Sequence, residues 1–171
     1  MNEFLMPAFQ FEVKLRRSPR IVAGSDIAEA EDAEPTGQGL GDGAFAECSG
    51  LEVEMDIQDY LEGGRNDGVI QQVGRAKYTN IVLKRGMFYD REGRLNTDLW
   101  AWLQGIVAGR PVARYDGIVT VMKRDHSLLT TWVFERGLPA KIRGPELNAK
   151  TGQIAIEELH IAHEGLRLIG V

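Results

Sequence analysis

The sequence pattern that most restricts the fold is a strict alternation of apolar and polar residues from Leu51 to Gln58. Successive side chains of a β-strand point to opposite faces, so the alternation predicts a long strand with one apolar and one acidic face. The apolar set is Leu51, Val53, Met55 and Ile57. The acidic set, which we call the acidic stripe, is Glu52, Glu54 and Asp56.

A polar segment at about residues 58–74 follows this strand. Its centre, Glu62-Gly63-Gly64-Arg65-Asn66-Asp67-Gly68, holds three glycines and an Asn-Asp pair, which favour turns with positive φ. We expect the chain to return through Val69 to Val73, to turn near Gly74, and to form a second strand from Tyr78 to Lys84. The segment has little apolar surface of its own to bury, so we expect a partner to order it.

Other alternations predict strands at about residues 9–15, 118–122 and 128–134, the last two as a hairpin. Four residues are then expected to interrupt regular structure, with a short extended piece at 140–142 between them: Gly137, Pro139, Gly144 and Pro145. In the last strand, Ile154 and Ile156 have even numbers, whereas Leu159 and Ile161 have odd numbers. In a regular strand the two pairs would therefore point to opposite faces. The change of face predicts a β-bulge or a strand that serves two sheets, and a turn is expected at 163–166.

One helix is predicted at about residues 97–108. Asn96 or Thr97 can cap its N-terminus, and Gly109 and Pro111 end it. Apolar residues recur at the spacing of one helical face, which we expect to pack on a sheet: Leu99, Trp102, Leu103, Ile106 and Val107.

These elements predict a mainly β fold: a small barrel or sandwich of two packed antiparallel sheets with one flanking helix. The chain has 171 residues and no visible domain boundary, so we expect one domain over 1–171. A stretch at about 17–44, rich in Ala, Gly, Glu and Asp, is expected to be a flexible insertion. It is either a surface loop or a partner-binding segment.

The composition argues against several functions. The net charge is −5, which disfavours a general nucleic-acid-binding surface. The sequence has no apolar run of about 20 residues for membrane insertion, and no basic segment followed by an apolar run that would mark a signal peptide. A single cysteine allows no intramolecular disulfide, as is usual for proteins of the reducing cytoplasm.

We find no catalytic, cofactor-binding or metal site in the sequence. The acidic stripe would need further ligands to hold a metal, and a solvated strand face explains it more simply. His160 and His163 would lie on opposite faces of a strand, and Cys48 has no histidine close in sequence. The expected protein is therefore not an enzyme and carries no cofactor.

Six motifs occur in order between Phe45 and Leu166: ECSGL at 47–51, YLEGG at 60–64, YTNIVLKRG at 78–86, LWAWL at 99–103, GPELNA at 144–149 and IAIEELHIAHEGL at 154–166. Together they resemble the tail-tube proteins of contractile phages and of phage-tail-like contractile injection systems. The resemblance implies a subunit of the inner tube, in which hexameric rings stack into a hollow conduit for cargo. Its implied partners are other copies of itself, the sheath protein, baseplate or hub proteins, and a tape-measure protein or cargo in the lumen.

The resemblance also gives the polar segment a role. It implies an inter-subunit arm whose candidate residues are Tyr60, Glu62, Gly63, Gly64, Arg65, Asn66 and Asp67. The acidic stripe would face the lumen or a neighbouring subunit. Assembly would take place in the bacterial cytoplasm, and the finished particle would be released or docked on a membrane.

Three departures from the family pattern keep other functions open. The insertion at 17–44 and the loop at 87–95 are longer than usual, and His160 stands where an acidic residue is common. The first alternative is a specialised subunit that initiates the tube or joins it to the baseplate. The second, from a different class, is a small β-barrel enzyme or ligand-binding protein.

Overall fold

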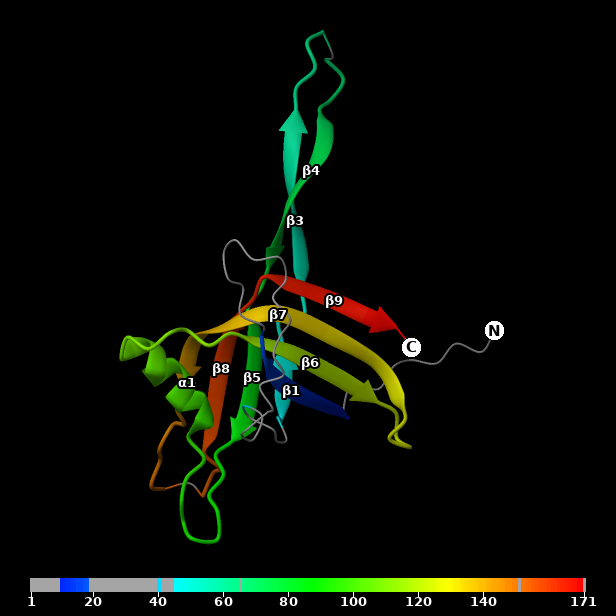
Figure 1. Ribbon diagram of the computed structural model, residues 1–171. Coiled ribbons are helices and arrows are strands. Elements are labelled where there is room, and N and C mark those ends of the chain that lie inside the picture. Colours follow the sequence, from blue (N-terminus) through cyan, green and yellow to red (C-terminus); the bar gives the residue numbers. More distant parts are fainter. Residues whose placement is uncertain (1–9, 19–39, 41–44, 65, 151, 171) are drawn as a thin grey trace, which may run out of the picture.

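The structure is a computed structural model that describes residues 10–18, 40, 45–64, 66–150 and 152–170 (Figure 1). Its elements in chain order are β1 (Phe11–Arg17), β2 (Glu47–Ser49), β3 (Val53–Tyr60), β4 (Ile70–Tyr78), β5 (Ile81–Gly86), α1 (Asp98–Val107), β6 (Tyr115–Met122), β7 (Leu128–Arg143), β8 (Ile156–Ala162) and β9 (Gly165–Gly170). Within the described ranges α1 is the only helix, and the predicted mainly β fold with one flanking helix is confirmed. Of the insertion predicted at 17–44, only residues 17, 18 and 40 are described.

Seven strands form the body of the molecule, and every pairing between them is antiparallel. They follow the order β1-β6-β7-β8-β5-β2, and β9 also pairs with β7. The first part of β7 pairs with β6 and β9, while its last part, from Leu138, pairs with β8. The long strand β7 therefore belongs to two layers, β1-β6-β7-β9 and β7-β8-β5-β2, which cross as a sandwich rather than a closed barrel (Figure 1).

The prediction that Gly137 and Pro139 interrupt regular structure is wrong, because β7 runs through both residues. The strand changes layer here: Arg136 has a φ of 56°, and the pairing with β8 shifts register between Pro139 and Lys141. A Cβ at Gly137 would lie 2.8 Å from both the Ile161 side chain and the Tyr115 carbonyl oxygen. Glycine and proline occur within a strand where it bends or bulges, and glycine where another segment lies too close for a side chain.

The core lies between the two layers. The first layer contributes Val13, Leu15, Val119 and Phe134, and the second contributes Ile81, Leu83, Leu159 and Ile161. Phe134 is fully buried and its ring occupies the space where Gly117 has no side chain, since a Cβ there would lie 2.0 Å from ring atoms. Phe45 and the helix residues Leu99 and Trp102 complete this cluster.

Helix α1 begins where the Asn96 side chain accepts a hydrogen bond from the Asp98 amide at 3.1 Å. Leu99 and Trp102 are buried, whereas Leu103 and Ile106 are half-buried. The expectation that Val107 belongs to the buried face is wrong, because it is 78% exposed in the last turn of the helix. The spacing rule places Val107 on the apolar side, but spacing alone does not show where the packed part of a helix ends.

The prediction of a β-bulge or a two-sheet strand at 154–161 is also wrong for β8. Strand β8 alternates regularly, with Glu157, Leu159 and Ile161 pointing inward. Ile154 and Ile156 are exposed. The sequence pattern misleads because the charged residue Glu157 occupies one of the inward positions. The expectation of a strand serving two sheets applies instead to β7.

Candidate assembly interface

Strands β3 and β4 form a separate two-stranded sheet that projects from the body (Figure 1). We call this hairpin, residues 53–78, the arm. The predicted turn near Gly74 is wrong, because β4 is continuous from Ile70 to Tyr78. Gly74 and Arg75 instead lie opposite Asp56 in a β-bulge, where the register shifts between Met55 and Ile57.

One face of the arm is apolar, and most of its side chains are exposed in the single chain. Cross-strand register pairs Val53 with Tyr78, Met55 with Ala76 and Ile57 with Val73, which places the six side chains on one face. Four of them are 42–68% exposed: Val53, Met55, Ile57 and Val73. The sequence predicts this face, but not that the body leaves it uncovered.

The acidic stripe begins at the root of the arm and continues on its opposite face. Glu54 lies opposite Lys77 in register, and Asp56 accepts a hydrogen bond from the Lys77 ammonium at 3.3 Å. Glu52 precedes β3 and accepts a hydrogen bond from the Thr79 hydroxyl at 3.4 Å. The Glu52 and Asp56 carboxylates thus bind groups of the arm and its root.

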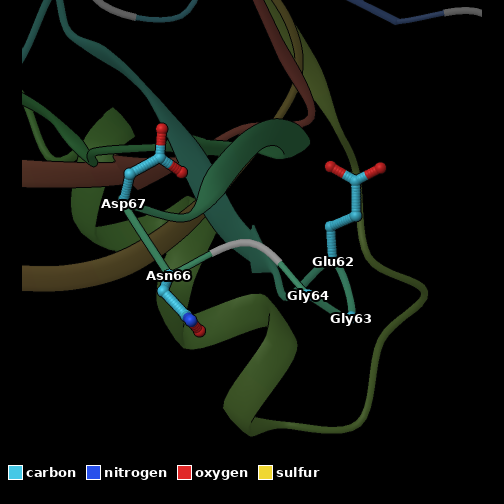
Figure 2. A pocket seen from close by; sticks show the side chains of 5 residues that line it. All are labelled: Glu62, Gly63, Gly64, Asn66 and Asp67. Carbon is cyan, nitrogen blue, oxygen red and sulfur yellow. The ribbon is translucent and has the colours of Figure 1, made fainter.

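The tip of the arm is a polar loop at the end farthest from the body. Glu62, Gly63, Gly64, Asn66 and Asp67 line a shallow, open hollow (Figure 2). In this view, the carboxylates of Glu62 and Asp67 point to one side of the loop and Asn66 points to the other. Tyr60, at the end of β3, is exposed, and Arg65 lies outside the described residues. The described members of the predicted arm set thus lie together at the exposed tip.

His163, for which the sequence predicts no role, joins the arm to the body. The His163 Nδ1 lies 2.9 Å from the Gly165 carbonyl oxygen, and its Nε2 lies 3.0 Å from the Thr79 carbonyl oxygen. The ring also contacts Tyr78 of the arm and Phe134 of the core, with centroids 5.3 and 5.7 Å apart. His163 is therefore a structural link at the root of the arm.

A buried polar network joins α1 to the second layer. The Arg85 Nε donates to the Glu157 Oε1 at 2.6 Å, and the Trp100 Nε1 donates to the Glu157 Oε2 at 3.0 Å. Arg85 also donates to the Asn96 side chain, whose oxygen begins the helix. Each carboxylate oxygen thus has a partner, which makes burial of this charge tolerable.

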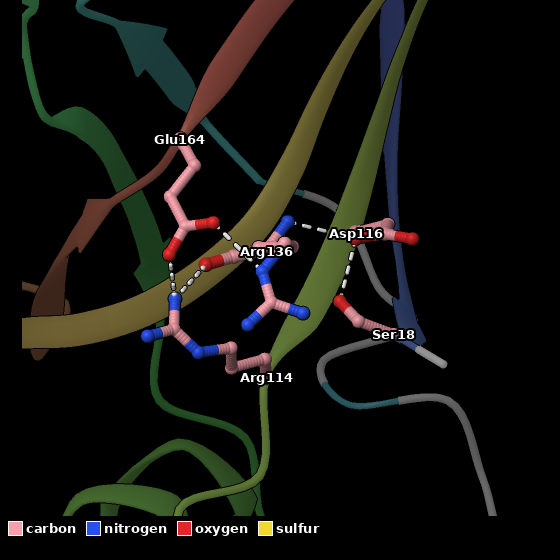
Figure 3. A network of polar contacts seen from close by, with 5 residues as sticks. All are labelled: Ser18, Arg114, Asp116, Arg136 and Glu164. Carbon is pink, nitrogen blue, oxygen red and sulfur yellow. Dashed lines mark hydrogen bonds and ion pairs between the residues drawn. The ribbon is translucent and has the colours of Figure 1, made fainter. Parts of the chain in front are cut away.

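A second polar network surrounds the bend of β7 (Figure 3). The Asp116 carboxylate accepts hydrogen bonds from the Arg136 amide and the Ser18 hydroxyl. Glu164 bridges the guanidinium groups of Arg114 and Arg136, with N–O distances of 2.6 and 2.7 Å. Arg114 also donates to the Arg136 carbonyl oxygen. These contacts hold the left-handed conformation of Arg136 and so stabilise the bend.

The described residues hold no group of three or more His, Cys, Asp or Glu side chains that could bind a metal ion. Burial raises the pKa of the Cys48 thiol to about 11, so the thiolate that a nucleophile requires is scarce at neutral pH. A hydrogen bond from His160 holds the pKa of Glu158 below its usual range. None of the described helices is long and apolar enough to cross a membrane.

Three solved structures share this fold over nearly the whole chain. A chain of the anti-feeding prophage (AFP) baseplate matches with a TM-score of 0.75 and 17% identity, covering 99% of this chain and 98% of that chain. A chain of the sheath-tube complex of the extracellular contractile injection system PVC matches with a TM-score of 0.73 and 21% identity, covering 99% and 94%. A chain of the AFP tube-terminating cap matches with a TM-score of 0.74 and 18% identity, covering 100% and 95%. None of the curated proteins matches the sequence.

The sandwich with its projecting arm is thus a fold found in contractile injection systems. The model of the T4-like virus tail tube protein gp19 family matches residues 7–167. The chain belongs to this family of structural tail-tube proteins, and it is a tube subunit. The resemblance seen in the sequence is confirmed.

Proposed function

We propose that copies of this chain assemble into hexameric rings that stack into a hollow tube, and that the arm is the element that joins subunits. The observation that carries this proposal is the arm itself, whose apolar face and polar tip are uncovered in the single chain. An isolated two-stranded sheet is at best marginally stable in water, so an arm of this kind is expected to be held by a neighbour. Membership of a tail-tube family supports the same role.

The tube is proposed to lie inside a contractile sheath, to meet a baseplate at one end and to enclose cargo or a tape-measure protein. The similarity to chains of a sheath-tube complex, a baseplate and a cap supports these partners. We propose a purely structural role without enzymatic activity. Assembly is proposed to occur in the bacterial cytoplasm, before the particle is released or docked on a membrane.

The experiment is electron microscopy of the purified protein beside a variant that lacks residues 63–67. We expect rings or tubes from the intact chain. The deletion is expected to leave the circular dichroism of the body unchanged and to shorten or abolish the tubes, because the tip contributes nothing to the core. Tubes of unchanged length would contradict the role of the arm.

A second candidate is a subunit that initiates the tube at the baseplate. The observation that favours it is the extended loop after β5, which exposes Phe88, Tyr89 and Leu95 and closes on itself through a bridge between the last two. Such a subunit is expected not to polymerise unless baseplate proteins are added. Tube formation by the purified chain would contradict this candidate.

A further inference from the structure

On β7 and β9, the inner face of the first layer is covered mainly at the end near Phe134, whereas on β6 both Val119 and Val121 are buried. Register places Val119, Trp132 and Leu168 side by side on three neighbouring strands, on the same face as Phe134. Phe134 is fully buried beneath the second layer. Two residues further along β7, Trp132 is only half-buried, and Leu168 beside it is 60% exposed. We call Trp132 and Leu168 the open end of the sandwich.

Strand β9, which carries Leu168 of the open end, is similar in length to strand β3 of the arm. The eight residues of β3 span about 26 Å and the six of β9 about 20 Å, at roughly 3.3 Å per residue. The open end and the apolar face of the arm both expose aliphatic side chains of a β-sheet. Two such faces pack together as the layers of a sandwich do.

The arm cannot cover the open end of its own chain. It projects away from the body, whereas β6, β7 and β9 run to one side of its root (Figure 1). The two surfaces can therefore meet only between different copies. A contact between two different surfaces repeats from copy to copy, as a ring requires.

Charge supports this pairing over contact between two arms. The arm holds five acidic and three basic residues, a net charge of −2. The first layer, counted as 11–17, 115–135 and 165–170, holds six basic and four acidic residues, a net charge of +2. Two arms would repel each other, while an arm and the first layer attract.

We propose that the apolar face of the arm packs on the open end of a second copy of this chain, at Trp132 and Leu168, and so completes the neighbour's sandwich. The proposal rests on the proposed function, because it requires the copies to assemble. Beyond that function, it identifies the surface of the neighbouring copy on which the arm packs.

Cysteine cross-linking tests the contact in assembled protein. In a Cys48→Ala background, one of Val53, Ile57 and Val73 is replaced by cysteine together with Leu168→Cys. A matched control replaces Ile169, which is also exposed but lies on the other face of β9. A disulfide needs Cα atoms within about 7 Å, so oxidation of at least one Leu168 pair is expected to give a ladder of covalent oligomers, roughly ten-fold more than its Ile169 control.

Mixing the two single-cysteine proteins gives a second readout. We expect one covalent dimer between the arm variant and the Leu168→Cys variant, and none with Ile169→Cys. Tubes that form normally but give no ladder, or a ladder with Ile169→Cys only, would overturn the contact and leave the tube function standing. If the Cys48→Ala protein forms neither rings nor tubes while remaining folded, the proposed function fails and the contact with it.

Discussion

Arg85 and Glu157, 72 residues apart in the sequence, form a buried ion pair with an N–O distance of 2.6 Å. The two side chains are 3% and 1% exposed. The pair lies between β5 and β8, and Trp100 and Asn96 link it to helix α1. It fixes the helix on the second layer through contacts that apolar packing cannot supply.

The first prediction concerns this pair. Glu157→Gln leaves the Arg85 guanidinium buried without a counter-charge, so we expect a loss of about 3–5 kcal/mol in the free energy of unfolding. Urea unfolding of unassembled protein measures it. The double variant Arg85→Met/Glu157→Leu is expected to lose less, because no lone charge stays buried. The buried pair would be unimportant if Glu157→Gln behaved like Arg94→Met, which removes two surface ion pairs that solvent already screens, with Asp90 and Glu92.

The second prediction separates the two ends of the helix face. Leu99 is buried, so Leu99→Ala is expected to cost about 2–5 kcal/mol of stability. Val107 is exposed, and Val107→Ala is expected to change stability by less than about 0.5 kcal/mol. Chemical denaturation of both variants gives the comparison. Equal losses would show that Val107 is buried in solution.

Local sequence signals predict the elements better than their contacts. The helix is predicted to within one residue at each end, because caps and apolar spacing are local. The alternation at 51–58 predicts a strand, but whether its apolar face is covered depends on distant segments. The pairing of Arg85 with Glu157 and the contacts of His163 with the arm root are equally non-local, and the sequence gives no signal for them.

Glycine and proline cause a different error, because they predict turns where the structure has continuous strands. Gly74, Gly137 and Pro139 are typical of turns, yet each lies within a strand, at a bulge or a bend. Their local preference is the same in both settings. Only the register of the neighbouring strand decides between a turn and a bulge, and that register is fixed by the fold as a whole.

The third prediction tests the centre of the core. In Gly117→Ala the new methyl group would overlap the Phe134 ring, which is buried and cannot move freely. Overpacking of this kind costs about 1–3 kcal/mol. Gly152→Ala is the matched control, because nothing lies within 4 Å of its added Cβ. A thermal melt of each variant checks the difference, and equal melting temperatures would contradict the packing.

The fourth prediction concerns acid pH. Hydrogen bonds from the Arg94 amide and side chain hold the pKa of Asp90 below its ordinary value of 3.8. A folded-state pKa below the unfolded one means that this stabilisation is present above about pH 4 and is lost as the pH falls through the folded-state value. Asp90→Asn should therefore be less stable than the natural chain at pH 6, with the difference shrinking below pH 4. Urea titrations across this range measure it, and a constant difference would argue against the linkage.

The last prediction concerns the root of the arm, where His163 lies between the carbonyl oxygens of Thr79 and Gly165. His163→Ala removes these polar contacts and the ring contacts with Tyr78 and Phe134. We expect faster amide hydrogen exchange in β3 and β4, because the root loses its link to the body, with no change between β1 and β6. His160→Ala is the control, since His160 contacts Glu158 at a site away from the root. If exchange rose equally throughout the chain, His163 would support the whole fold rather than the arm.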